Sequence, residues 1–190
     1  MPPRANHHTI VALVEDKPGV LNRIASKWRQ RGFNIESLAV GHSEIPGLSR
    51  MTFTVDGATH DVEQVTKQLY KVIEVVKISD ITDEDVVARE LALIRVATNN
   101  QTRAMILDMV RLFRANVIDV SHASLILEAT GDEDKIEALY ELLLPFGVEE
   151  LMRTGRIAMT RGGAGTHLDD GSRRRYRSAG EGKAQVGSLL

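Results

Sequence analysis

The 190-residue sequence contains no cysteine, which excludes disulfides, thiolate metal sites and a cysteine nucleophile. Aromatic residues make up only 4% of the chain, too few to indicate a stacking platform for nucleic-acid bases. No apolar run approaches the roughly 20 residues that span a bilayer, and the N-terminus lacks a signal-peptide pattern. The formal net charge is −2, so charge does not indicate a nucleic-acid partner. We therefore expect a cytoplasmic protein that binds neither membranes nor nucleic acids.

The first part of the chain is predicted to be a small unit with the element order β-α-β-β-α-β. A strand-like run at 8–14 precedes a helix whose apolar face is Val20, Leu21, Ile24, Ala25 and Trp28. Gly32 indicates the end of that helix. Strands at 34–43 and 48–57 follow, joined by the turn Glu44–Gly47. A second helix capped by Asp61, with Val62, Val65, Leu69 and Val72 inward, and a strand at 75–81 complete a ferredoxin-like order.

The same order of elements returns after an acidic stretch. A strand begins at Glu90, and the next helix has an apolar face that repeats the first at a fixed shift of about 85 positions: Met105, Ile106, Met109, Val110 and Phe113. Two strands, a helix and a closing strand follow within 116–155. The fold class is therefore predicted to be α+β, with two tandem ferredoxin-like βαββαβ domains.

The predicted boundaries are an N-terminal tail at 1–7, a first domain at 8–82, a linker at 83–89 and a second domain at 90–162. Residues 163–190 are rich in glycine, serine and arginine without an apolar face, which is typical of a flexible tail. The cluster Arg173–Arg175 with Arg177 could contact an acidic partner. A solvated tail without a partner is the simpler explanation.

The most informative motif is the turn Asp16-Lys17-Pro18-Gly19. Pro18 is expected at the first helical position, so that the backbone N–H groups of Gly19, Val20 and Leu21 point out of the helix N-terminus. Such donors, at the positive end of the helix dipole, bind a small carboxylate as well as a phosphate.

An Asp16 carboxylate beside these donors could hold an ammonium group, and the two ends together describe a free amino acid. An ordinary helix start, with Asp16 as its cap, remains the alternative at this point. The second copy has Asn99-Asn100-Gln101-Thr102 at the corresponding turn and lacks the Pro-Gly. A ligand site kept by only one copy would therefore be in the first.

No arrangement of residues in the sequence indicates catalysis. The six histidines are scattered, and the pair His7-His8 lacks a spaced third ligand for a metal. The glycines of 162–165 resemble a phosphate loop but lack its Lys-Ser/Thr. We expect no catalytic residue, no metal site and no cofactor in this chain.

The stretches HTIVALVEDKPGVLNRIASKWRQRGFNIESLAVG and GLSRMTFTV closely resemble the ACT domain of the regulatory (small) subunit of acetohydroxyacid synthase, also called acetolactate synthase. The runs RGFNIESL and LSRMT are particularly specific to that subunit among ACT proteins. The resemblance continues through ELALIRV and ANVIDV to about Gly162, and leaves out the tail.

This resemblance implies a non-catalytic subunit that activates a catalytic (large) subunit and confers feedback inhibition by branched-chain amino acids, chiefly valine. Thiamine diphosphate, Mg²⁺ and FAD would belong to that catalytic partner alone. ACT domains in this family pair into an eight-stranded sheet, which implies a homodimer with effectors at its interface.

By similarity, the effector's carboxylate would meet the N–H groups of Gly19, Val20 and Leu21. Asp16, where the family often has asparagine, would face the ammonium group. Asn34 and Ile35 would come from the neighbouring protomer.

Two other functions fit the same topology. One is a stand-alone amino-acid sensor that regulates a different enzyme. The other is a nucleotide-binding signalling protein, which would need a long loop between the middle strands, whereas the turn at 43–47 is short.

Overall fold

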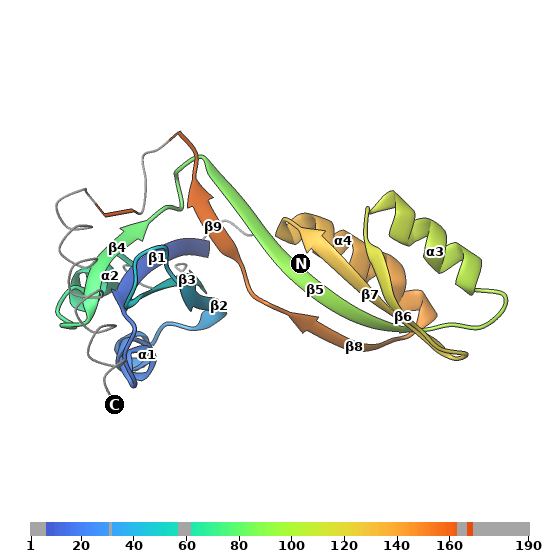
Figure 1. The fold of residues 1–190 in the computed structure, drawn as a ribbon, viewed down its shortest axis with the longest axis horizontal. Coiled ribbons are helices and arrows are strands. Elements are labelled where there is room, and N and C mark those ends of the chain that lie inside the picture. Colours follow the sequence, from blue (N-terminus) through green and yellow to red (C-terminus); the bar gives the residue numbers. More distant parts are fainter. Residues whose placement is uncertain (1–6, 31, 57–61, 163–166, 169–190) are drawn as a thin grey trace, which may run out of the picture. The chain divides into compact units, whose positions relative to one another are not determined.

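The computed structural model describes residues 7–30, 32–56, 62–162 and 167–168 (Figure 1). Its contacts divide the chain into two compact units, Met1–Val87 with Ala158–Leu190 and Ala88–Ile157. Each unit is built around an antiparallel sheet with two α-helices, which confirms the predicted α+β class.

The first unit has the predicted order of elements. They are β1 (His7–Glu15), α1 (Val20–Gln30), β2 (Ile35–His42), β3 (Leu48–Asp56), α2 (Val62–Leu69) and β4 (Val75–Asp80). The strands pair antiparallel in the order β2-β3-β1-β4, so β2 and β4 are edge strands. The interior strand β1 is buried on both faces, which explains its unbroken apolar run.

Both helices of this unit pack on the same face of the sheet, since their buried residues share one core cluster with alternate residues of β1 and β3. Trp28 lies at the centre, with its ring 5.4 Å from that of Phe33 and 5.8 Å from that of Phe53. The predicted face is wrong at one position, because Leu21 is 40% exposed. Asp61, predicted to cap α2, lies outside the described residues, and so does the side chain of Val65.

The second unit repeats this order. Its elements are β5 (Val86–Ala97), α3 (Arg103–Leu112), β6 (Asn116–Val120), β7 (Ser124–Gly131), α4 (Glu133–Leu143), the short 3-10 helix η1 (Leu144–Phe146) and β8 (Val148–Arg153). The strand β9 (Ile157–Thr160) follows and, apart from Ile157, is counted with the first unit. The sheet order is β6-β7-β5-β8, with β9 also paired to β5. The sequence patterns did not indicate β9, and residues 86–89 of the expected linker belong to β5.

The fixed shift of 85 positions does not hold for the helices. The core residues Ile24 and Trp28 of α1 follow Val14 by ten and fourteen positions, and Ile106 and Val110 of α3 follow Val96 by the same numbers. The two copies are therefore related by 82 positions here, and Met105, predicted to be inward, is 53% exposed. The spacing from strand core to helix core is the same in the two copies, and the turns between them differ in sequence.

Most of the tail predicted at 163–190 lies outside the described residues. His167 and Leu168 are described, and Leu168 is buried against the first unit, so at this point the chain packs on the domain instead of being solvated.

Candidate functional site

The candidate site is the turn between β1 and α1. Gly19 has a φ of +83°, and the amide of Val20 donates to the carbonyl of Lys17 at 3.4 Å. Proline followed by a residue of positive φ is the sequence signature of a type II turn. Pro18 and Gly19 therefore form this turn, and α1 begins at Val20 instead of at Pro18 as predicted.

The turn leaves backbone donors at the start of α1. Arg23 donates to the carbonyl of Gly19 and closes the first helical turn. Within the described part of the chain, the amides of Gly19 and Leu21 have no acceptor, whereas that of Val20 has only its long contact with Lys17. The first turn of α1 contains no acidic residue that could occupy these donors.

The approach to these donors is open. A Cβ built on Gly19 would meet no atom within 4 Å. Gly19 is therefore required by its positive φ, and it also leaves the backbone accessible to a ligand.

Asp16 is held beside this turn by its backbone. Its amide donates to the carbonyl of Gly47, in the β2–β3 turn, at 2.8 Å. Its carboxylate lies 3.2 Å from Nδ1 of His42, and both side chains are exposed. Among the described residues, this carboxylate accepts no hydrogen bond from α1, which disfavours the alternative that Asp16 is a helix cap.

No local sequence pattern indicated that His42 belongs to this site. It lies at the C-terminal end of β2, and the antiparallel pairing of β2 with β3 and of β3 with β1 brings it to the end of the sheet where Asp16 lies. The predicted set of site residues therefore omitted one polar neighbour.

The nearby cations are paired with carboxylates. Nζ of Lys17 lies 2.5 Å from Glu15, and Nη2 of Arg23 lies 2.7 Å from Glu74. The hydrogen bond and the charge of Glu15 raise the pKa of Lys17. With both cations already paired, attraction for an anion at this turn comes mainly from the backbone amides and the helix dipole.

Asn34 and Ile35 lie far from Asp16 in the sheet. Ile35 pairs with Val55, whose other neighbour is His8 at the start of β1. Asp16, by contrast, follows the last residue of β1. One chain therefore does not bring Asn34 and Ile35 to the turn that carries Gly19, Val20 and Leu21.

The corresponding turn of the second copy satisfies its own donors. The side-chain oxygen of Asn99 accepts from the amides of Gln101 at 2.8 Å and Thr102 at 3.0 Å. The guanidinium of Arg103 donates to the carbonyls of Ser121 and His122. These contacts leave the first copy as the better candidate for a ligand site.

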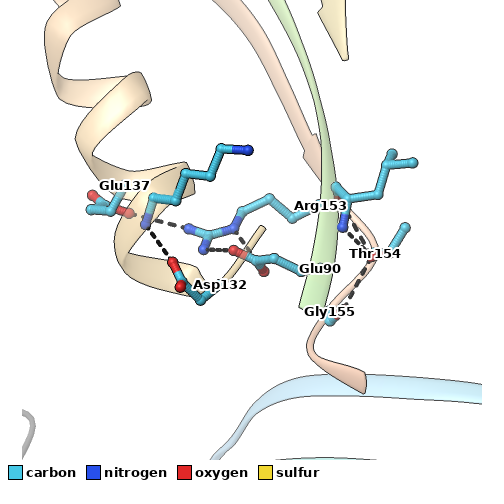
Figure 2. Close-up of polar contacts among 8 residues, drawn as sticks. Glu90, Asp132, Glu137, Arg153, Thr154 and Gly155 are labelled. Carbon is cyan, nitrogen blue, oxygen red and sulfur yellow. Dashed lines mark hydrogen bonds and ion pairs between the residues drawn. The ribbon is translucent and has the colours of Figure 1, made fainter. Parts of the chain in front are cut away.

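Polar side chains of the second unit form an ion cluster that joins β5, β8 and α4 (Figure 2). Arg153 contacts Glu90 through Nε at 3.3 Å and through Nη2, and contacts Glu137 through Nη1 at 3.2 Å. Burial lowers the pKa of Arg153, but the hydrogen bond and charge of Glu90 and the charge of Glu137 outweigh it and raise that pKa.

Glu90 is only 6% exposed, and its carboxylate accepts hydrogen bonds from Arg153. At the start of α4, Asp132 accepts from the amide of Lys135 and caps the helix (Figure 2). With both acids bound to Arg153, the cluster is a structural link between elements.

The described residues include no group of three or more acidic, histidine or cysteine side chains that could hold a metal ion. The pair His7-His8 instead contacts two carboxylates, since His7 lies 3.3 Å from Glu36 and His8 lies 3.0 Å from Asp80.

None of the described helices is long and apolar enough to cross a bilayer.

Two family models match the chain. The model described as the AHAS small subunit-like ACT domain matches residues 10–77, and the model described as the small subunit of acetolactate synthase matches residues 89–162. The first contains the candidate site and the second contains the ion cluster.

Several curated relatives are about half identical to this chain. A probable acetolactate synthase small subunit of Archaeoglobus fulgidus is 54% identical over 155 residues, which cover 82% of this chain and 97% of the relative. The acetolactate synthase small subunit of Mycobacterium bovis is 52% identical over 158 residues, covering 83% and 94%. That of Bacillus subtilis is 49% identical over 154 residues, covering 80% and 90%.

The crystal structure of the acetolactate synthase small subunit from Thermotoga maritima has the same fold. It superposes with a TM-score of 0.76 at 42% sequence identity, covering 83% of this chain and 99% of that one. The matches cover both units, and the identities are well above those at which only a fold is shared. The chain therefore belongs to the family of acetolactate synthase small subunits, with an ACT domain in its N-terminal half.

Proposed function

We propose that this chain is a non-catalytic regulatory subunit of acetolactate synthase. It activates a thiamine-diphosphate-dependent catalytic subunit and makes that enzyme sensitive to valine, or to another branched-chain amino acid, in the cytoplasmic synthesis of valine, leucine and isoleucine. The observation that carries the proposal is the β1–α1 turn, which keeps open donors beside Asp16, whereas the second copy caps its own. The ACT domain at 8–82 would bind the effector, and the domain at 90–162 would complete the subunit.

The turn suits both charged ends of a free amino acid. The carboxylate would accept from the amides of Gly19 and Leu21, whose hydrogen bonds are open, and from Val20 once its long contact is released. The ammonium group would pair with Asp16. Charged partners make hydrogen bonds roughly twice as strong as neutral ones, so both ends contribute to affinity.

A homodimer would complete the site. The edge strand β2 has Ile35 at one end and His42 at the other. If two copies of β2 pair antiparallel about a two-fold axis, the second copy's Ile35 and Asn34 fall opposite the His42 end of the first. That end is where Asp16 lies, so an eight-stranded sheet would bring the two halves of the site together.

Regulation would then be allosteric. The dimer binds the catalytic subunit and favours its active arrangement, and the effector shifts the assembly toward a less active one. Such coupling is typically about 1–3 kcal/mol, and it requires the effector to bind the two states unequally. Thiamine diphosphate, Mg²⁺ and FAD belong, in this proposal, to the catalytic subunit.

Reconstitution tests the proposal. The purified chain is added to the catalytic subunit of the same organism, acetolactate formation is measured, and valine, leucine and isoleucine are titrated. We expect an increase in activity followed by inhibition. Binding of these amino acids without any effect on acetolactate formation would instead support a stand-alone sensor for another enzyme.

A further inference from the structure

Leu168 lies beyond residue 162, where the family match ends, and is nevertheless only 7% exposed. Its side chain packs in a cluster with three buried residues of the first unit, Leu13, Ile45 and Leu48. Val76 packs against the same cluster. The segment after β9 therefore has a defined apolar contact with the ACT domain.

A polar contact lies beside this apolar one. Nζ of Lys77 donates to the backbone carbonyl of His167 at 2.9 Å. Because the acceptor is the carbonyl, this contact depends on the path of the backbone at His167 and not on its imidazole. Lys77 and Val76 are adjacent in the edge strand β4, so the two contacts hold one short segment against one strand.

This apolar cluster lies on the face of the sheet opposite to the helices. Leu13 alternates in β1 with Ala12 and Val14, which belong to the core under α1 and α2. Successive side chains of a strand point to opposite faces, so Leu13 points away from the helices. Ile45, from the turn between β2 and β3, belongs to the same cluster.

The β2–β3 turn also binds the backbone of Asp16. Ser43 accepts from the amide of Ile45 at 3.0 Å, and Leu48 donates to the carbonyl of Ile45 at 3.1 Å. The carbonyl of Gly47 accepts from the amide of Asp16 at 2.8 Å. Two residues of the Leu168 cluster, Ile45 and Leu48, therefore belong to the same hydrogen-bonded turn as Gly47, which holds the Asp16 backbone.

We infer that His167–Leu168 is an intramolecular docking segment, and that its apolar contact stabilises the β2–β3 turn that holds Asp16. The segment that packs on these apolar residues belongs to the same chain and to the same compact unit. A consequence that rests on the proposed function is that losing this contact weakens effector binding. The docking itself is independent of any effector.

Hydrogen exchange of the full chain tests the docking. In Leu168→Ser, exchange of the Asp16 and Leu48 amides should rise at least about tenfold, because burying a leucine side chain contributes more than the free energy of a tenfold change. Exchange of the Phe33 amide, which donates to Trp28 in the helix-side core, should stay unchanged and so exclude general unfolding.

His167→Ala is the matched control, since it keeps the carbonyl that Lys77 uses, and its exchange should equal that of the wild type. Unchanged exchange at Asp16 and Leu48 in Leu168→Ser would overturn the inference. So would an equal rise at Phe33, because the effect would then not be local to the turn.

Calorimetric titration with valine tests the coupling separately. We expect the Kd of Leu168→Ser to rise several-fold above that of the wild type. An unchanged Kd would overturn the coupling to the effector site. If the wild type binds none of valine, leucine and isoleucine, the proposed function fails, whereas the exchange measurement still decides the docking.

Discussion

Gly19 combines a conformational and a spatial role at one residue. Its φ of +83° is a region that L side chains adopt at a cost of roughly 1–2 kcal/mol, and its surroundings would leave room for a side chain. A substitution there therefore need not disrupt packing. It would instead place atoms where a bound carboxylate is expected.

Gly19→Asp is predicted to separate activation from inhibition. The new carboxylate would occupy the open donors and repel the effector's carboxylate, so valine inhibition should be lost, whereas activation of the catalytic subunit should remain. The measurement is acetolactate formation by the reconstituted enzyme across a valine titration. Full valine sensitivity in this variant would contradict the assignment of the site.

Two controls separate charge from strain. Gly162 also has a positive φ, +69°, and open space around it, so Gly162→Asp imposes similar backbone strain away from the turn and should keep valine inhibition. Gly19→Ala adds strain without charge and should retain part of the inhibition.

Asp16 is predicted to contribute affinity through its oxygen atoms. Asp16→Asn keeps a side-chain oxygen and should change the valine Kd only a few-fold. Asp16→Leu leaves the ammonium group without a partner, and losing a charged hydrogen bond of about 1.5–3 kcal/mol should weaken binding roughly ten- to a hundred-fold. Isothermal titration calorimetry measures both.

His42→Ala is the control for this pair. Exposed ion pairs contribute about 0–1 kcal/mol, so losing the imidazole should leave stability nearly unchanged. Binding of valine should persist, because the Asp16 carboxylate then faces no competing imidazole. Loss of binding in His42→Ala equal to that in Asp16→Leu would instead make the histidine the recognition group.

At the scale of single residues, the sequence predicted the local conformation of the Asp16–Gly19 turn. It did not predict which residues the strand pairing brings next to that turn. The order Asp-Lys-Pro-Gly predicts a turn with open donors, because proline and glycine act on their own backbone dihedrals. His42 approaches Asp16 only through two strand pairings, which no local pattern encodes.

At the scale of elements, periodicity predicted both helical faces except at their margins. Leu21 and Met105 each sit at the margin of an apolar face, where one residue of register decides exposure. The four-residue strand β9 was missed because so short a run carries no alternation that distinguishes it from a loop, and it is stabilised by pairing with the distant β5. The contact of Leu168 is likewise long-range.

The ion cluster gives an element-scale prediction. Arg153→Met leaves the buried carboxylate of Glu90 without its main partner, and breaking a buried pair on one side costs about 3 kcal/mol or more. Urea denaturation followed by circular dichroism should show this loss in the free energy of unfolding. Arg111→Met, in an exposed pair with Asp108, should change it by less than about 0.5 kcal/mol.

A double substitution distinguishes charge burial from lost packing. Glu90→Leu combined with Arg153→Met removes both charges and should recover much of the stability lost in Arg153→Met alone. If the double variant is less stable than the single one, the cluster contributes net stability and the interpretation as a compensated buried charge is wrong.

At the scale of the whole molecule, the proposed site requires two copies of the chain. Asn34 and Ile35 lie at the opposite end of β2 from His42, and no motion within the sheet can bring them to Asp16. The edge strand β2 also carries Val40, which is 49% exposed. An exposed apolar residue on an unpaired edge is typical of a strand that pairs with another chain.

Val40→Asp is therefore predicted to weaken both the dimer and effector binding. Two copies of β2 that pair antiparallel place both introduced carboxylates on the same short interface, where like charges repel. Sedimentation should show a dissociation constant raised at least tenfold, and valine binding should weaken in parallel as the monomer accumulates. Ile73→Asp, at another exposed apolar residue outside β2, should leave both unchanged. A monomeric Val40→Asp that still binds valine with wild-type affinity would mean that one chain holds the complete site, and Asn34 and Ile35 would then have no part in it.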